Sequence, residues 1–214
     1  VGVTNIGAIV GYKKEQFKKY DDISLFENKN YSNNNILHSL FCAREFFDDD
    51  IIIAYGDIWF KQKPFDSIIK AKEDFVIAVD TNFEEYYVGR TDHPLSEAEI
   101  VHYDKNHHVQ IIGKCHHELM ISKYMIGEFM GLLKISKSLI QKLIVEFEIL
   151  ESTLSNEDEF QNALEFQKAY LTDFIQYLIS KSYNISCVVN SGGWYEIDTV
   201  QDLDNLKKVL DCGE

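Results

Sequence analysis

The chain has 214 residues, of which 45% are hydrophobic, and its formal net charge at pH 7 is -14. This length and apolar content are enough for a substantial core, so disorder is not the default expectation. The negative charge argues against a nucleic-acid partner and against binding to an anionic membrane, because both need a cationic protein face.

The first half of the chain alternates predicted strands with predicted helices. Apolar runs predict strands at 6–12, 24–28, 51–55 and 74–80. Helical periodicity predicts helices at 35–47 and 64–72, and the second has a proline near its start. This alternation predicts a mostly parallel sheet with helices on both faces.

The pattern changes after Asp80. Polar and apolar residues alternate at 98–104 and 108–114, which predicts two antiparallel strands joined by a turn. A strand that contains glycines follows at 125–135, and Ser136 or Ser138 is placed to cap the next helix.

The last third is predicted to be mainly helical. A long helical stretch from about 155 to 180 carries Leu164, Leu171, Ile175 and Leu178 toward one face. A strand at 185–190, a loop at 191–199 and a helix at 200–210 end the chain. The prediction is one α/β domain with a mostly parallel mixed sheet flanked by helices and a small antiparallel elaboration.

The cysteines point to a reducing compartment. The four of them, at Cys42, Cys115, Cys187 and Cys212, show no Cys-x-x-Cys spacing, which favours free thiols over disulfides or a zinc site. No apolar run approaches the length of a membrane span, and no charged-then-apolar leader opens the chain. We expect a cytoplasmic protein with no membrane partner.

Two acidic residues follow predicted strands. Asp57 comes after the strand at 51–55 and follows Gly56, and Asp198 precedes the last helix. Gly-Asp is also ordinary turn chemistry, and Asp198 or Thr199 is suited to cap the helix. Two carboxylates brought to one edge of a sheet would suit Mg²⁺ together with substrate phosphate.

Six segments carry a resemblance to a known family. They are GYKKEQF (11–17), ENKNYSNNNILHSL (27–40), YGDIWF (55–60), GEFMGLLKIS (127–136), AYLTDFIQYLI (169–179) and GGWYEIDTVQDL (192–203). In this order they resemble the bacterial nucleotidyltransferase family of choline-phosphate cytidylyltransferases and phosphonate cytidylyltransferases linked to phosphoenolpyruvate mutase. The resemblance implies a Rossmann-like nucleotidyltransferase fold and transfer of CMP from CTP to a small acceptor, with release of pyrophosphate.

The sequence departs from that family in one respect. Members are expected to begin with a strand and a glycine-rich loop, Gly-x-Gly-x-x-x-Arg followed by Pro-Lys, which wraps the triphosphate. This pattern does not occur here. We therefore expect a single nucleotidyltransferase domain at 1–214 that lacks the first strand, the glycine-rich loop and most of the first helix.

The resemblance also implies roles for individual residues. Asp57 and Asp198 would hold Mg²⁺, and Lys114 would meet the anionic group of the acceptor, unless it is an ordinary surface lysine at a strand end. Glu128 and Asp173 are expected to contact the acceptor. The alternatives are a structural salt bridge for Glu128 and a solvated helix face for Asp173.

The nucleotide and the ammonium group have their own candidates. Gly11, Asn35, Ser39 and Gly56 are expected near the nucleotide, although caps and turns explain such residues equally well. Four aromatic residues are candidates for a cage around a quaternary ammonium, although core packing explains most aromatics: Tyr86, Tyr87, Trp194 and Tyr195.

Four histidines suggest a metal cluster less strongly. They are His107, His108, His116 and His117. Adjacent histidines on a strand point to opposite faces, so a hairpin with exposed histidines is favoured over a metal site.

These observations predict a cytoplasmic, Mg²⁺-dependent cytidylyltransferase. Its acceptor would be a small zwitterionic phosphate or phosphonate, of the phosphocholine or 2-aminoethylphosphonate type. The alternatives are a sugar-1-phosphate nucleotidyltransferase of the same fold and a noncatalytic nucleotide-binding module.

Overall fold

The computed structural model describes residues 3, 5–114 and 123–211. They form two compact units, one from Val1–Asp50 and Lys137–Tyr177 and the other from Ile51–Ser136 and Leu178–Glu214. In the part of the chain that is described, no helix has the length and apolar character that crossing a membrane requires. The predicted single-domain organisation stays a prediction.

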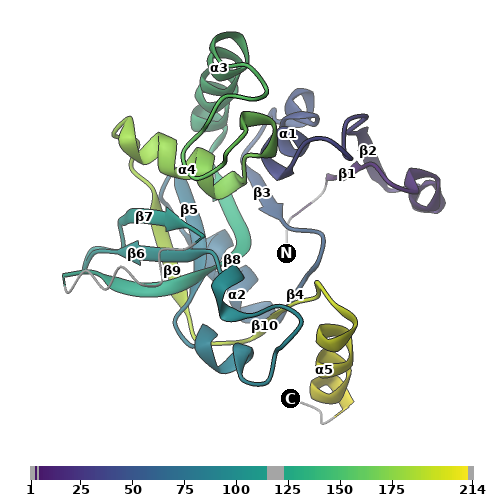
Figure 1. Ribbon diagram of the computed structural model, residues 1–214, viewed down its shortest axis with the longest axis vertical. Helices are drawn as coiled ribbons and strands as arrows, with labels where there is room; N and C mark the ends of the chain where they lie inside the picture. Colours follow the sequence, from purple (N-terminus) through teal and green to yellow (C-terminus); the bar gives the residue numbers. More distant parts are fainter. Residues whose placement is uncertain (1–2, 4, 115–122, 212–214) are drawn as a thin grey trace. The chain divides into compact units, whose positions relative to one another are not determined.

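The second unit is built on a mixed sheet of six strands (Figure 1). They are β3 (Ile51–Ala54), β5 (Phe75–Asp80), β6 (Ile100–Tyr103), β7 (Val109–Gly113), β8 (Met125–Ile135) and β9 (Ser186–Asn190). Their order is β7-β6-β8-β5-β9, and β3 also pairs with β8.

The long strand β8 forms the centre of this sheet. Glu128 pairs with both Asp80 of β5 and Ile100 of β6, so β5 and β6 lie on opposite edges of β8. Near its end β8 pairs with β3 in place of β6. Gly131 has a φ of +66° between the two pairings, and a Cβ there would lie 2.9 Å from the ring of Tyr55. Glycine is therefore needed where β8 passes from one neighbour to the other.

The strands of this sheet run in both directions. Within the described sheet β5 and β9 run parallel, whereas β3, β5 and β6 are all antiparallel to β8, as β6 is to β7. The predicted mixed sheet with flanking helices is confirmed, since β3, β5, β6 and β9 run in one direction and β7 and β8 run in the other. The alternation of strands and helices in the sequence does not reveal that β8 is inserted between strands β5 and β6.

The core of this unit lies against β5, all of whose residues are buried. The helix α2 (Gln62–Lys70) packs Ile68 against Val76, Ala78 and Leu132 of the sheet. The period of two in β5 places Val76 and Ala78 on the same face, where the helix covers them. The predicted hairpin is also confirmed, since β6 and β7 pair antiparallel with His107 in the left-handed region of its turn.

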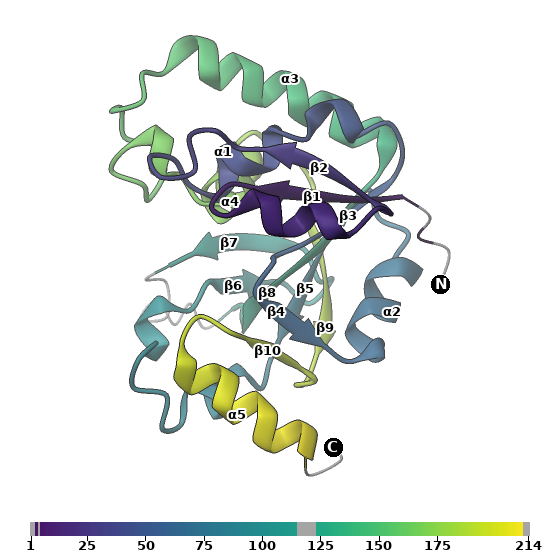
Figure 2. The same ribbon diagram turned by 90° about the vertical axis from the view of Figure 1, so that its right-hand side faces the viewer.

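A small second sheet joins β4 (Ile58–Phe60) to β10 (Trp194–Glu196), and β10 leads into the helix α5 (Val200–Asp211). Figure 2 shows α5 beside β10. The loop predicted at 191–199 therefore contains a short strand. This strand carries the aromatic and acidic residues of the last motif.

The first unit consists of a parallel pair of strands and several helices. Its regular elements are β1 (Ile6–Val10), β2 (Ile23–Glu27), α1 (Ile36–Phe41), α3 (Lys137–Thr153) and most of α4 (Leu171–Ser180). Aromatic rings fill its core, and those of Phe41 and Phe147 stack with their centroids 3.9 Å apart. The helix predicted at 35–47 is shorter than expected, because a short 3-10 helix replaces its second half.

The long helix predicted from 155 to 180 is wrong. Residues 155–170 form turns and a 3-10 helix, and α4 begins only at Leu171. Leu171, Ile175 and Leu178 are buried as expected, but Leu164 is 80% exposed. Apolar spacing matched a helix across a segment whose backbone follows turns.

Candidate active site

The two predicted metal ligands lie at the same end of the small sheet. Glu196 pairs with Ile58 in an antiparallel register, so the end of β10 meets the start of β4. One step further, the backbone N–H of Ile197 donates to the carbonyl oxygen of Asp57 at 2.9 Å. Asp57 and Asp198 are thus neighbours across adjacent strand ends, although 141 positions separate them in the sequence numbering.

The charge of Asp198 acts on Asp57. Partial desolvation raises the pKa of Asp57, and the negative charge of Asp198 acts in the same direction. A cation at this edge would relieve that repulsion.

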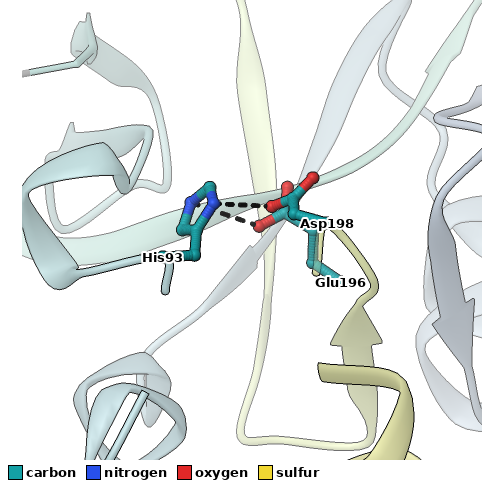
Figure 3. A group of neighbouring side chains, drawn as sticks. All are labelled: His93, Glu196 and Asp198. Carbon is teal, nitrogen blue, oxygen red and sulfur yellow. Dashed lines mark ion pairs between the residues drawn. The ribbon is translucent and has the colours of Figure 1, made fainter. Parts of the chain in front are cut away.

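Two cationic or polar side chains approach Asp198 from the segment after the 3-10 helix Phe83–Tyr87. Figure 3 shows His93 facing Glu196 and Asp198, with its Nδ1 atom 2.9 Å from Asp198 Oδ2. The guanidinium of Arg90 lies 3.4 Å from Asp198 Oδ2 and 3.6 Å from Glu196 Oε2. Its Nε atom donates to Asp202 at 2.6 Å, so Arg90 connects three carboxylates.

The helix cap at this edge belongs to Thr199 and Asp202. Asp202 Oδ2 accepts hydrogen bonds from the backbone N–H groups of Asp198 and Thr199 and from the Thr199 hydroxyl. The Thr199 hydroxyl oxygen in turn accepts from the Asp202 backbone N–H, which completes a reciprocal cap. Thr199 is the N-cap, so the side chain of Asp198 is left to face Arg90 and His93.

Burial and neighbouring groups shift the pKa values of Glu196, His93 and Asp202. Burial raises the pKa of Glu196 to about 8, and the charges of Asp198 and Glu128 add to the rise. Burial and the charge of Arg90 lower the pKa of His93. Burial opposes ionisation of Asp202, but hydrogen bonds from Arg90 and Thr199 outweigh it and lower its pKa.

A pocket of the second unit adjoins this edge. The residues that line it are Tyr86, Tyr87, Arg90, Glu128, Trp194, Tyr195, Glu196, Asp202 and Asn205. All four aromatics proposed as an ammonium cage are among them. The ring of Tyr86 is edge-on to those of Trp194 and Tyr195, at centroid distances of 6.3 Å and 5.1 Å.

Two buried carboxylates accept hydrogen bonds from these aromatic side chains. Glu128 is 4% exposed and accepts a hydrogen bond from the Tyr87 hydroxyl. Burial raises the pKa of Glu128 to about 8, against the effects of Tyr87 and Arg90. Asp80 is fully buried and accepts from the Trp194 indole N–H at 2.9 Å and from the Gly192 backbone N–H at 2.8 Å.

Lys114 and Gly56 occupy less enclosed positions. Lys114 follows β7, and its ammonium lies 3.0 Å from Glu97 Oε2. Gly56 lies in the turn between β3 and β4, and a Cβ at this position would meet nothing within 4 Å. Their predicted roles stay predictions.

The remaining predicted residues lie in the first unit. Asp173 is 2% exposed and accepts from the backbone N–H groups of Asn162 and Tyr170, the second of which is part of the cap of α4. Asn35 caps α1 by accepting from the Ile36 N–H at 2.8 Å.

Ser39 and Gly11 also make local contacts. The Ser39 hydroxyl oxygen accepts from the Asn28 amide at 2.8 Å. A Cβ at Gly11 would lie 2.6 Å from Tyr31. The nucleotide roles of Gly11, Asn35 and Ser39 stay predictions.

The cluster formed by Asp57, Arg90, His93, Glu196 and Asp198 is called the acidic edge. Three of its residues, Arg90, His93 and Glu196, were not predicted from the sequence. Glu196 had a signal, since it lies two positions before Asp198 on a strand and so shares its face. Arg90 and His93 lie in an irregular segment whose position no pattern reveals. The two free cysteines at described positions, Cys42 and Cys187, agree with the expected thiols. Cys115, Cys212, His116 and His117 lie outside the described residues.

The chemistry of the edge fits Mg²⁺ better than a transition metal. Asp57 and Asp198 supply carboxylate oxygens, which Mg²⁺ prefers. His93, Glu196 and Asp198 also bring ligand atoms within 4.8 Å of one another. However, Arg90 contacts the carboxylates of both Glu196 and Asp198, so its positive charge competes with a cation placed between them.

Comparisons with known proteins agree with the fold. No family model matches the chain. It is 29% identical over 213 residues to the CTP:phosphoglutamine cytidylyltransferase of Campylobacter jejuni, covering 95% of this chain and 81% of that protein. Its structure resembles a CTP:phosphocholine cytidylyltransferase from Streptococcus pneumoniae, with a TM-score of 0.69, 20% identity, and coverage of 98% of this chain and 79% of the other.

A further solved structure is similar in fold. The inositol-1-phosphate CTP transferase of T. maritima gives a TM-score of 0.69 at 14% identity, over 98% of this chain and 77% of the other. The fold is therefore the Rossmann-like nucleotidyltransferase fold, and the chain is an enzyme of the nucleotidyltransferase class. The resemblance to bacterial cytidylyltransferases that the sequence motifs predict is confirmed.

Proposed function

We propose that this enzyme transfers CMP from CTP to a small phosphorylated alcohol or phosphonate that carries an ammonium group. The sequence relative and two similar structures are named for cytidylyl transfer to phosphoglutamine, phosphocholine and inositol 1-phosphate, which supports CTP and a phosphorylated acceptor. An acceptor phosphate or phosphonate oxygen attacks the α-phosphorus of CTP. The bond from that phosphorus to the bridging oxygen breaks, and pyrophosphate leaves.

The residues that line the pocket beside the acidic edge support an ammonium-bearing acceptor. Four aromatic side chains and three carboxylates line it. A cation is attracted through its charge by the negative faces of aromatic rings and by nearby carboxylates, and a neutral sugar lacks that charge. Glu128 is 4% exposed and lines the pocket together with the aromatic rings, and we assign it to the ammonium.

The acidic edge would handle the phosphates. Asp57 and Asp198 would hold Mg²⁺, which supplies positive charge to the reacting phosphate groups when bound. Lys114 would meet the anionic end of the acceptor, and Gly11, Asn35, Ser39 and Gly56 would contact the nucleotide. Asp173 would be a second acceptor contact, although it also accepts hydrogen bonds from the backbone N–H groups of Asn162 and Tyr170.

We also propose a cytoplasmic location. The thiols of Cys42 and Cys187 are free, as expected in a reducing compartment.

Pyrophosphate release tests this function. The full chain is assayed with CTP, ATP, GTP and UTP against phosphocholine, phosphoethanolamine, 2-aminoethylphosphonate, inositol 1-phosphate and glucose 1-phosphate. We expect release with CTP and the ammonium-bearing acceptors, dependent on Mg²⁺. Faster release with glucose 1-phosphate than with every amine would favour a sugar-1-phosphate nucleotidyltransferase, and tight nucleotide binding without any release would favour a noncatalytic module.

A further inference from the structure

The backbone at Asp198 is held by one buried carboxylate. Asp202 is 4% exposed, and its Oδ2 atom accepts three hydrogen bonds, at 3.2 Å, 2.9 Å and 2.8 Å, from Asp198 and Thr199. Its other oxygen accepts from Arg90 Nε at 2.6 Å. Both oxygens of Asp202 are thus engaged, and its orientation is fixed from two sides.

Arg90 is itself held in place. The backbone N–H of Arg90 donates to the Tyr87 carbonyl at 3.1 Å, and its guanidinium lies 5.2 Å from the centroid of the Tyr87 ring. The side chain is 7% exposed, so water screens its contacts weakly. A rigid guanidinium fork can contact several carboxylates at fixed angles, which an ammonium group cannot do.

We propose that Arg90 is a positioning residue, which acts through Asp202 to fix the direction in which the Asp198 carboxylate points. This inference rests on the proposed function only in taking Asp198 as a ligand of the divalent cation. Arg90 needs no contact with substrate or metal for this role. Arg90 also approaches the Asp198 carboxylate directly, at 3.4 Å, and this longer contact limits the movement of the carboxylate.

Two effects of Arg90 on cation binding have opposite signs. Its positive charge disfavours a second cation nearby, whereas the geometry it imposes favours binding. Replacing it by a neutral residue would change both effects together. Arg90→Lys keeps the charge and removes the fork, so this substitution isolates the geometry.

Direct binding of Mn²⁺ tests the proposal without turnover. Free Mn²⁺ is counted by electron paramagnetic resonance with the full chain, in the absence of nucleotide and acceptor. We expect Arg90→Lys to weaken Mn²⁺ binding by about tenfold, the usual scale for an outer partner of a metal ligand. Asp198→Asn in the same assay shows how much of the binding depends on that carboxylate.

Gln201→Ala is the matched control. The Gln201 amide joins the same loop to α5 through Gly89, Thr91 and Asp92, and no hydrogen bond to Asp202 is described for it. We expect its Mn²⁺ affinity to equal that of the wild type. If Gln201→Ala weakens binding as much as Arg90→Lys does, attachment of the loop explains the effect and the positioning role is wrong.

A second substitution covers the case in which Arg90→Lys does not fold. Thr199→Val removes the hydroxyl that donates to Asp202 and keeps the shape of the side chain. We expect weaker Mn²⁺ binding than in the wild type. Unchanged affinity in whichever of the two variants folds would overturn the proposal.

The inference and the proposed function fail in different ways. A wild-type protein that does not bind Mn²⁺, or one in which Asp198→Asn leaves the affinity unchanged, overturns the inference. Asp198-dependent and Arg90-dependent Mn²⁺ binding in a protein that releases no pyrophosphate with any substrate pair overturns the function and supports the inference.

Discussion

The acidic edge and the neighbouring pocket place carboxylates in contrasting surroundings. Asp57 and Asp198 are exposed to solvent at the ends of two strands, and Asp198 faces Arg90 and His93. Glu128 in the pocket is nearly inaccessible to water and meets the hydroxyl of Tyr87. Solvated carboxylates suit a hydrated cation such as Mg²⁺, whereas a buried carboxylate keeps its proton until an organic cation replaces it.

Neutralising the edge should have the largest effect. Asp57→Asn or Asp198→Asn keeps the shape of the side chain but removes the charge that faces the cation. We expect Mg²⁺-dependent pyrophosphate release to fall by about 10²–10³-fold or more, with the melting temperature nearly unchanged. Near-normal activity in either variant would show that the edge does not hold the metal.

Glu128→Gln should have a smaller and more selective effect. We expect the transition-state stabilisation of ammonium-bearing acceptors, calculated from kcat/KM, to fall by about 2 kcal/mol, the scale of a lost charge-assisted hydrogen bond. The kcat/KM for hydroxyl acceptors should change little. Glu73→Gln, at an exposed site, serves as the control. An unchanged choice between amine and hydroxyl acceptors in Glu128→Gln would remove the ammonium pocket from the account.

The raised pKa of Glu128 predicts a dependence on pH. Because this pKa lies at about 8, an ammonium group that needs the ionised form binds better as pH rises toward 8. We therefore expect the KM of an ammonium-bearing acceptor to fall between pH 6.5 and 8.5. The KM in Glu128→Gln should be nearly independent of pH in this range, and an equal fall in the variant would assign the titration to another group.

The same pKa has a consequence for stability. The pKa of Glu128 in the folded protein is raised above that of an unfolded glutamate, so protonation of Glu128 stabilises the folded state. This contribution is complete at pH values below the pKa of the unfolded glutamate, and it is lost as pH rises through about 8. Glu128→Gln removes this loss. The melting temperature of the variant should therefore gain on that of the wild type as the buffer is changed from pH 5 to pH 8.5.

Asp173 provides the smallest expected effect and the sharpest contrast with Glu128. Each of its carboxylate oxygens accepts from a backbone N–H group, and Asp173→Asn keeps only one of these oxygens, so it should cost about 1 kcal/mol of stability, the scale of one lost hydrogen bond. Denaturant unfolding measures this, and acceptor preference is measured in parallel. A loss of kcat/KM for amines as large as that in Glu128→Gln would make Asp173 an acceptor contact as well.

The sequence predicts the strands and the acidic edge better than it predicts the connections between them. The sequence predicts that Asp57 and Asp198 lie at one edge of a sheet, because each of them comes directly after the apolar residues that predict a strand. The turns before α4 are not found, because Leu164 has helical spacing without being buried. Arg90 and His93 reach Asp198 through an irregular segment, and its path depends on tertiary hydrogen bonds rather than on local periodicity.

A single competition experiment tests the central claim that an ammonium group selects the acceptor. The wild-type enzyme is given CTP, Mg²⁺ and equal concentrations of phosphocholine, 2-aminoethylphosphonate and glucose 1-phosphate, and the products are identified by mass spectrometry at low conversion. We expect cytidylylated ammonium compounds to dominate the product mixture. A mixture dominated by the cytidylylated sugar would contradict the claim.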